Sequence, residues 1–148
     1  MACRDGVRGR VSWPRLEGLA RHLCERYDRD VAHVTFLDAD NWLSTPFVVD
    51  DELFVKCVTP QNALVHGFIT RGRNLGAVSS GQQAFFDHVG TPAEMAAREL
   101  AATERMREAG LNAPEPVESF AYDDMGVLVL EFLPAFQTLD DLDDETLA

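Results

Sequence analysis

Two pairs of apolar, strand-like segments are each joined by a short acidic turn, and no other feature constrains the fold as strongly. The pairs are residues 44–49 with 52–58, around Asp50-Asp51, and residues 117–122 with 126–132, around residues 123–125. Runs rich in Val, Phe and Leu separated by two or three turn residues are typical of β-hairpins. A fifth strand-like run, VAHVTFL (31–37), precedes the first pair. The sequence therefore predicts a sheet of five strands that is mainly antiparallel.

The clearest helix begins at Thr91. The segment TPAE is a capping box, with Thr91 at the N-cap, Pro92 in the first turn and Glu94 placed to bond back to the cap. The apolar pattern continues to Ala109, and Gly110 is well placed to end the helix. We expect this long helix to pack on the sheet.

Two further helices are predicted. Residues 14–27 form an amphipathic pattern whose apolar face is made by Leu16, Leu19, Ala20, Leu23 and Tyr27. Residues 61–77 are moderately apolar and also predicted to be helical. A loop over 78–83 and a short helical turn over 84–90 would complete this insert.

These elements indicate an α+β fold, a five-stranded antiparallel sheet with one long packed helix, preceded by an N-terminal helix. We expect residues 1–30 to be a helical extension and residues 31–142 to be the main domain, with a helical insert at 60–90. Residues 143–148 would be an acidic tail.

The net charge of −12 makes nucleic acid and anionic membranes poor default partners, because both repel an acidic surface. A basic strip at the N-terminus is the local exception, and it leaves nucleic acid as a minor alternative: Arg4, Arg8, Arg10 and Arg15. The longest apolar run, GVLVLEFLPAF, is too short to span a bilayer. Acidic chains with arginine in place of lysine resemble proteins of salt-loving archaea.

Three cysteines form no CxxC pair, so we expect reduced thiols and a cytoplasmic location: Cys3, Cys24 and Cys57. The four histidines have no zinc-ligand spacing, so no metal site is predicted.

Lys56 is the only lysine in the chain, and it lies in the middle of the apolar run LFVKCV. On a strand it shares one face with Phe54 and Val58, while its neighbours Val55 and Cys57 point to the other face. Both faces are apolar, so the ammonium is expected to be partly buried and to need a partner. The alternative is a lysine that extends along the sheet to reach water.

Glu99 is the expected partner. At helical spacing it lies among Met95, Ala96, Ala102, Thr103 and Met106, and it is the one charge in that apolar stripe. A carboxylate that faces the sheet requires a cation, and Lys56 provides one. The alternative is a rotated helix with Glu99 half-exposed.

Four segments in this order resemble the N-terminal lobe of protein-kinase-like phosphotransferases: FLDADNWLSTPFVV, FVKC, RELAATERMREAGLNAPEPV and VLVLEFL. The likeness covers residues 31–142. It is nearest to the atypical branch, which includes RIO-type kinases, the Bud-type kinases of the KEOPS complex and aminoglycoside-phosphotransferase relatives. In protein kinases a lysine on the third strand contacts the α- and β-phosphates of ATP and pairs with a helix glutamate.

The resemblance implies that ATP is the cofactor. Lys56 and Glu99 would align its phosphates, and Asn41 would lie in the nucleotide loop. Leu130 would be the gatekeeper, with the Glu131 C=O and the Leu133 N–H facing the adenine.

The chain also departs from the family pattern. The nucleotide loop has no G-x-G-x-x-G, and residues 60–94 make a longer connection than in compact kinases. The segment RGRNLG (71–76) in that connection is either a flexible basic loop that reaches toward phosphates or a solvated helix end. The H-x-D and D-F-G motifs of the second lobe do not occur, so no catalytic residue is predicted and the expected Mg²⁺ has no ligands here.

We therefore expect the ATP-binding lobe of an atypical serine/threonine kinase, truncated and inactive alone. The alternatives are a non-catalytic kinase-like module that binds a protein partner, and a fragment of a small-molecule phosphotransferase. A partner or second lobe would cover the apolar hinge surface around Leu130–Phe136.

Overall fold

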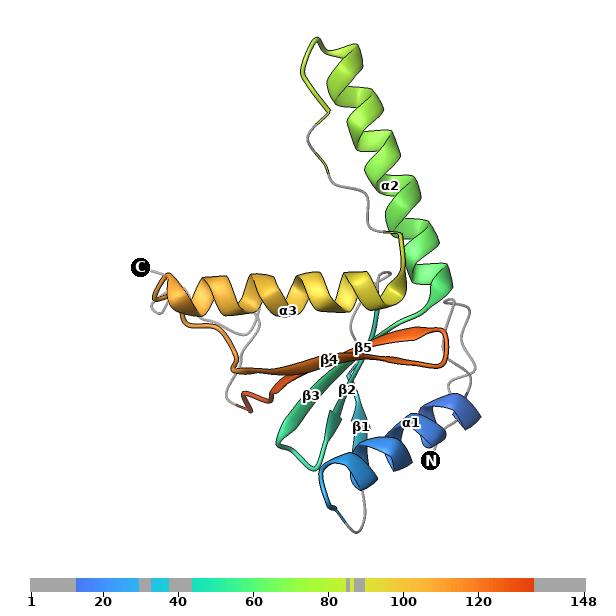
Figure 1. Ribbon diagram of the computed structural model, residues 1–148, viewed down its shortest axis with the longest axis vertical. Coiled ribbons are helices and arrows are strands. Elements are labelled where there is room, and N and C mark those ends of the chain that lie inside the picture. The colour runs from blue at the N-terminus through green and yellow to red at the C-terminus, as the bar shows by residue number, and fades with distance from the viewer. Residues whose placement is uncertain (1–12, 30–32, 38–43, 85, 87–89, 135–148) are drawn as a thin grey trace, which may run out of the picture.

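The computed structural model describes residues 13–29, 33–37, 44–84, 86 and 90–134. Within these residues the fold is α+β, as expected, with a five-stranded antiparallel open sheet and three helices (Figure 1). The elements are α1 (Trp13–Arg26), β1 (Val34–Phe36), β2 (Thr45–Val49), β3 (Leu53–Val58), α2 (Pro60–Ser79), α3 (Pro92–Glu108), β4 (Pro116–Tyr122) and β5 (Met125–Glu131).

The strand order is β1-β2-β3-β5-β4, and both predicted hairpins are present. At the first turn Asp50 and Asp51 have φ of 53° and 55°, as a type I′ turn requires. The second turn is one residue shorter than predicted, because Met125 pairs with Tyr122 and is buried in β5. The hairpins place β3 and β5 side by side at the centre of the sheet.

One face of the sheet is covered by α1. Leu16, Leu19 and Leu23 are buried and form one apolar cluster with side chains of the three central strands: Phe47, Val49, Val55, Cys57, Met125, Val127 and Val129. The helix that the sequence suggested as an extension (1–30) therefore shares its core with the sheet. Figure 1 shows α1 and α3 on opposite sides of the strands.

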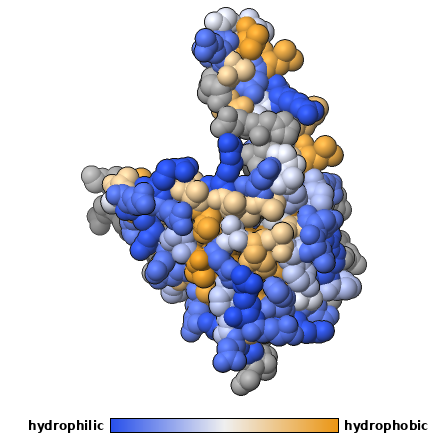
Figure 2. All heavy atoms as spheres, in the orientation of Figure 1, coloured by the Kyte–Doolittle hydropathy of each residue, from blue (hydrophilic) through white to orange (hydrophobic). Residues whose placement is uncertain are grey.

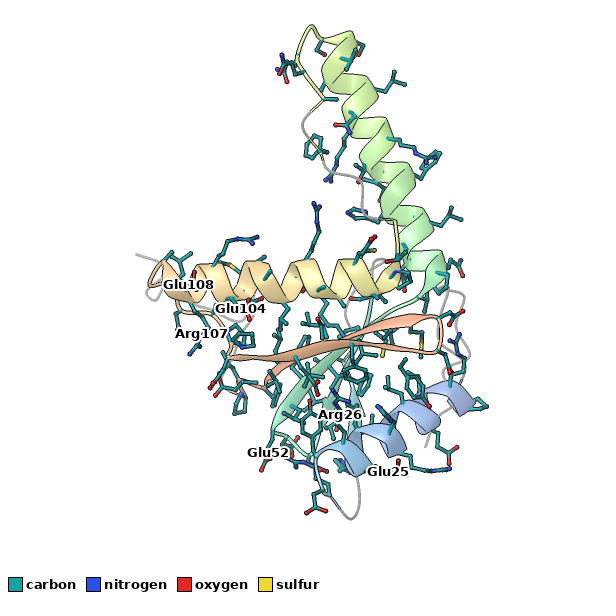
Figure 3. The ribbon with its side chains drawn as sticks, in the orientation of Figure 1. Glu25, Arg26, Glu52, Glu104, Arg107 and Glu108 are labelled. Atoms are coloured by element: carbon teal, nitrogen blue, oxygen red, sulfur yellow. The ribbon has the colours of Figure 1, made fainter. Side chains whose placement is uncertain are left out.

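Polar contacts attach the C-terminal end of α1 to β4. Figure 3 shows Arg26 near the C-terminal end of α1. Arg26 forms two hydrogen bonds with the Glu118 carboxylate, and the Tyr27 hydroxyl donates to Glu118 Oε1 at 2.5 Å. The Arg26 guanidinium also lies 4.7 Å from the centre of the Phe120 ring. Hydrogen bonds from Arg26, followed by those from Tyr27, outweigh partial burial and lower the pKa of the Glu118 carboxyl.

The other face of the sheet is covered by α3. Ala96 and Leu100 pack against Leu128 and Leu130 of β5, and the Thr91 capping box forms as predicted. The predicted apolar stripe was partly wrong, because Met106 is 41% exposed and Leu100 contacts the sheet instead. The helix is therefore rotated slightly from the expected orientation.

A close backbone contact sets the height of α3 above the sheet. A Cβ atom at Gly126 of β5 would lie 2.0 Å from the Pro92 carbonyl oxygen at the start of α3. Any side chain at this position would displace the helix, so only glycine permits the observed packing.

Helix α2 is found close to its predicted range. It begins at Pro60, with a capping box made by Thr59 and Asn62, and continues to Ser79, beyond the predicted end at residue 77. It is longer than α3, yet it projects away from the sheet (Figure 1). The helical turn predicted over 84–90 is not found at Ala84, Phe86 or Gly90, the residues of that range that are described. In the described part of the chain, no helix combines the length and apolar character needed to cross a membrane.

The contact at Gly126 makes a testable prediction about stability. Gly126→Ala should lower the free energy of unfolding by about 1–3 kcal/mol, because the added methyl overlaps the Pro92 backbone. Gly72→Ala is the matched control: nothing lies within 4 Å of a Cβ there, and alanine should raise helix stability by up to about 1 kcal/mol. Urea unfolding of both variants measures the two free-energy changes. Equal changes at Gly126 and Gly72 would contradict the close contact between Gly126 and Pro92.

The Glu118 contacts predict a pH dependence. The pKa of the Glu118 carboxyl is lower in the folded chain than its ordinary value of 4.5. Its contacts therefore stabilise the fold fully above pH 4.5, and this stabilisation is lost as the pH falls below 4.5 toward the lowered pKa. Glu118→Gln should therefore reduce stability at pH 7 and make the loss of stability below about pH 4.5 less steep. Denaturant unfolding at several pH values measures this. Glu25→Gln, which removes an exposed α1 carboxylate that pairs with no basic side chain among the described residues, is the control.

Candidate functional site

Lys56 lies near the centre of the sheet. Its neighbours across the strands are Pro46 of β2 and Leu128 of β5, and its side chain is 17% exposed. The Nζ atom lies 2.5 Å from Oε1 of Glu99, so β3 and α3 are joined by the ion pair that the sequence predicted. The pair forms because the alternation along β3 directs Lys56 to the face that α3 covers.

Glu99 lies at the edge of the sheet-facing side of α3. Ala96 and Thr103 are buried on that side, whereas the Glu99 side chain is 41% exposed. Glu99 was expected either to pair with Lys56 or to lie half-exposed on a rotated helix. Both hold in part, since the carboxylate is half-exposed and still reaches Lys56. An ammonium that is mostly removed from water gains a charged acceptor, while the acceptor keeps part of its hydration.

The surroundings of the pair on the sheet are apolar. Phe54, Leu128 and Leu130 form the cluster beside it, with Ala96 and Leu100 above. Leu130 is only 6% exposed, so the predicted open apolar surface around this residue is wrong at Leu130 itself. Leu130 pairs with Phe54, two residues along β3 from Lys56, so both side chains lie on the α3 face.

The residues that the sequence predicted for the hinge follow Leu130 directly. The Glu131 N–H donates to the Glu115 C=O at 2.9 Å, and the Glu115 N–H donates to the Glu131 carboxylate at 3.1 Å. The next N–H along the chain, that of Phe132, donates to the Glu52 C=O at 2.9 Å. Leu133 follows the end of β5 and is partly buried. Glu131 and Leu133 thus lie where the chain leaves the sheet, at the end of β5 beyond Leu130.

Asn41 lies outside the described residues, as does most of the predicted nucleotide loop. The segment RGRNLG is described, and it is helical. It belongs to the part of α2 that projects beyond the sheet, so it is a solvated helix segment and not a loop beside Lys56 (Figure 1).

Cys57, the neighbour of Lys56, is not suited to nucleophilic chemistry. It points to the α1 side of the sheet and is fully buried. Burial raises the pKa of its thiol to about 12, so the reactive thiolate does not form near neutral pH. Among the described residues, no group of three or more His, Cys, Asp or Glu side chains is placed to hold a metal ion.

Gly126 is the residue that the sequence reasoning missed. It does not touch the ion pair, yet it permits the approach of α3 that brings Glu99 over Lys56. A glycine inside an apolar strand often marks a close backbone contact, and this signal was present in GVLVLEF.

No protein-family model matches the chain, and no curated protein matches it either. The function must therefore be argued from the geometry of the Lys56–Glu99 pair and the elements that position it.

The different exposure of the two partners predicts unequal mutational effects. Glu99→Ala should destabilise the fold more than Lys56→Met, because it leaves a mostly buried ammonium unpaired, whereas the lysine change leaves a half-exposed carboxylate. A double-mutant cycle measured by urea unfolding should give a coupling energy of about 1 kcal/mol. The exposed Glu17–Arg21 pair is the control and should give less than about 0.5 kcal/mol. No coupling between Lys56 and Glu99 would mean that the contact does not hold in solution.

Proposed function

We propose that this chain is the ATP-binding N-terminal lobe of an atypical protein-kinase-like phosphotransferase. The observation that carries the proposal is the contact between Lys56 of β3 and Glu99 of α3. A lysine on the third strand that pairs with a glutamate on the following packed helix is the arrangement with which protein kinases hold the phosphates of ATP.

The chemistry of the pair suits phosphate binding. An ammonium has three donors, and among the described residues Glu99 is the one acceptor that Lys56 contacts. The remaining donors can meet oxygens of the α- and β-phosphates, while the carboxylate keeps the side chain directed toward them. Low exposure strengthens this attraction, because the electrostatic interaction is less screened than at an open surface.

The hinge supports the same proposal. Leu130 lies on the face of the sheet that carries Lys56, and β5 ends one residue later at Glu131. The Glu115 N–H bonds to the Glu131 side chain, so it does not occupy the Glu131 C=O. That carbonyl and the Leu133 N–H are the groups proposed to bond the adenine edge.

Phosphoryl transfer needs groups beyond this lobe. The catalytic aspartate and the Mg²⁺ ligands of kinases come from motifs that the chain does not contain. The proposal is therefore ATP binding without turnover by this chain alone, and Mg²⁺ would enter with the nucleotide. The second candidate, a non-catalytic module that binds a protein, is favoured by the exposed apolar side chains of α2.

Because Lys56 is the only lysine, it is the only side-chain amine that an acylating nucleotide can label. An acyl phosphate of ATP transfers its acyl group to an amine next to the bound phosphates and releases ATP. We expect labelling of Lys56, mapped by peptide mass spectrometry, that excess ATP suppresses by at least about tenfold.

Variants make the test specific. Glu99→Ala should weaken both labelling and ATP affinity measured by calorimetry. Lys56→Arg should bind ATP more weakly as well, since a planar guanidinium does not replace a compact charge. Arg29→Lys, which adds a second lysine where Arg29 pairs with Asp50 and Glu52 at the β2–β3 turn, is the control and should gain no ATP-protected label. Labelling of Lys56 that ATP does not suppress, together with no heat of binding, would refute the proposal.

A further inference from the structure

Helix α2 carries a regular row of exposed side chains. Leu64, Phe68, Leu75 and Val78 are 74%, 79%, 72% and 55% exposed. Together with exposed Arg71 they recur at alternating spacings of four and three residues. This is the 3.5-residue period of a helix that packs along a second helix. We refer to Leu64, Phe68, Arg71, Leu75 and Val78 as the α2 seam.

The contacts that attach α2 to the rest of its domain come from other side chains than those of the seam. Asn62, Ala63 and Thr70 are buried on another side of the helix. On that side Asn74 forms two hydrogen bonds with the backbone of Phe86, at 2.8 and 3.0 Å, which fix the returning chain to the helix. The seam lies beside this side of the helix, and its apolar side chains remain largely exposed. Figure 2 shows apolar side chains exposed along the projecting part of the molecule.

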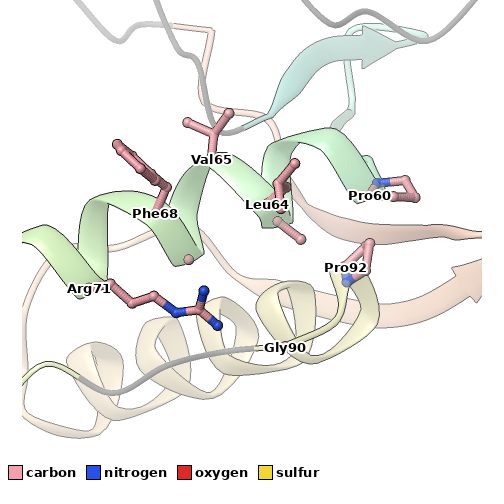
Figure 4. Close-up of a pocket in the computed structure, with 9 residues that line it drawn as sticks. Pro60, Leu64, Val65, Phe68, Arg71, Gly90 and Pro92 are labelled. Atoms are coloured by element: carbon pink, nitrogen blue, oxygen red, sulfur yellow. The ribbon is translucent and has the colours of Figure 1, made fainter.

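The N-terminal half of the seam borders a hollow. Leu64, Phe68 and Arg71 line an open space of about 610 Å³ that reaches Gly90 and Pro92 at the start of α3 (Figure 4). A large apolar side chain of a second helix could enter there while its neighbours cover Leu75 and Val78. An exposed apolar row beside a hollow is the form that helix-binding grooves take.

The charge of α2 indicates the charge of the helix that would bind it. Residues 60–84 contain Arg71 and Arg73 and no acidic residue, in a chain whose net charge is −12. Arg71 is the central position of the seam, and it forms no ion pair with any residue that the structure describes. A guanidinium enclosed between two helices needs a carboxylate opposite it.

A second copy of the chain does not supply a carboxylate opposite Arg71. Because Arg71 is central, two seams paired in register bring Arg71 against Arg71, whether the helices run parallel or antiparallel. Like charges within a helix interface oppose that pairing and act against self-association. An anionic membrane surface is disfavoured by the acidic remainder of the chain.

We propose that the α2 seam binds an amphipathic helix of another protein that has apolar residues at heptad spacing and an acidic residue facing Arg71. The complex would be a short two-helix pair extending from the hollow to Val78. This inference does not depend on nucleotide binding, because it rests on the exposure, spacing and charge of the α2 side chains and not on the Lys56–Glu99 pair.

The probe is a fluorescein-labelled amphipathic peptide of about 21 residues, or three heptads. It has leucine at the core positions and glutamate at the central one, and a matched peptide has lysine there. Fluorescence anisotropy should show that the wild-type chain binds the glutamate peptide at least about tenfold more tightly than the lysine peptide. Arg71→Glu should reverse this order, and Phe68→Ser should weaken binding of both peptides.

Arg73→Glu is the charge-matched control, because Arg73 lies off the seam and stacks on Phe86, and it should keep the wild-type order. The seam is exposed, so circular dichroism should show all variants folded. Equal affinity for the two peptides, or no binding, would overturn the proposal. So would a wild-type dimer in sedimentation equilibrium that Phe68→Ser dissociates, or binding to phosphatidylserine vesicles that Phe68→Ser abolishes.

Discussion

The close approach of Pro92 to Gly126 determines where α3 lies, and the candidate site depends on that position. A side chain at residue 126 would collide with the Pro92 carbonyl, so the missing Cβ allows the first turn of α3 to rest on β5. The capping box at Thr91 and Glu94 then directs the helix across the sheet. Glu99 follows Pro92 by two turns, or about 10 Å along the helix axis, which brings its carboxylate over Lys56.

Both faces of the sheet are covered, and this explains why the lysine is so little exposed. On one side α1 buries three leucines and is attached to β4 through Glu118, while α3 covers the other side. The central strands are therefore held from both directions, and the β3 backbone that carries Lys56 has little freedom to move. A charge in such a place is retained only when a partner is supplied, and Glu99 supplies it at modest cost because it remains half in water.

Much of this fold could be predicted because its signals are local. Acidic turns between apolar runs indicated the hairpins, and TPAE indicated the start of α3. Lys56 and Glu99 could be paired because each is a lone charge in an apolar pattern. The rotation of α3, which exposes Met106 and directs Leu100 to the sheet, could not be predicted, since it depends on packing against strand residues far from α3 in the chain. The sequence made no prediction about the projection of α2, because moderate apolarity does not show whether a helix packs within its own domain or faces outward.

Pro92 connects the two regions for which functions are proposed. Its carbonyl touches Gly126 beneath α3, and the same residue lines the hollow beside Leu64 and Phe68. A helix bound in that hollow would contact the turn of α3 that sets the height of Glu99. Because a helix moves as a unit along its axis, any displacement of Pro92 would be transmitted to the carboxylate two turns away. If the hollow is occupied without moving Pro92, the α2 seam is only an attachment surface. If Pro92 moves, the strength of the Lys56–Glu99 contact becomes linked to the partner, because both depend on the same backbone contact with β5.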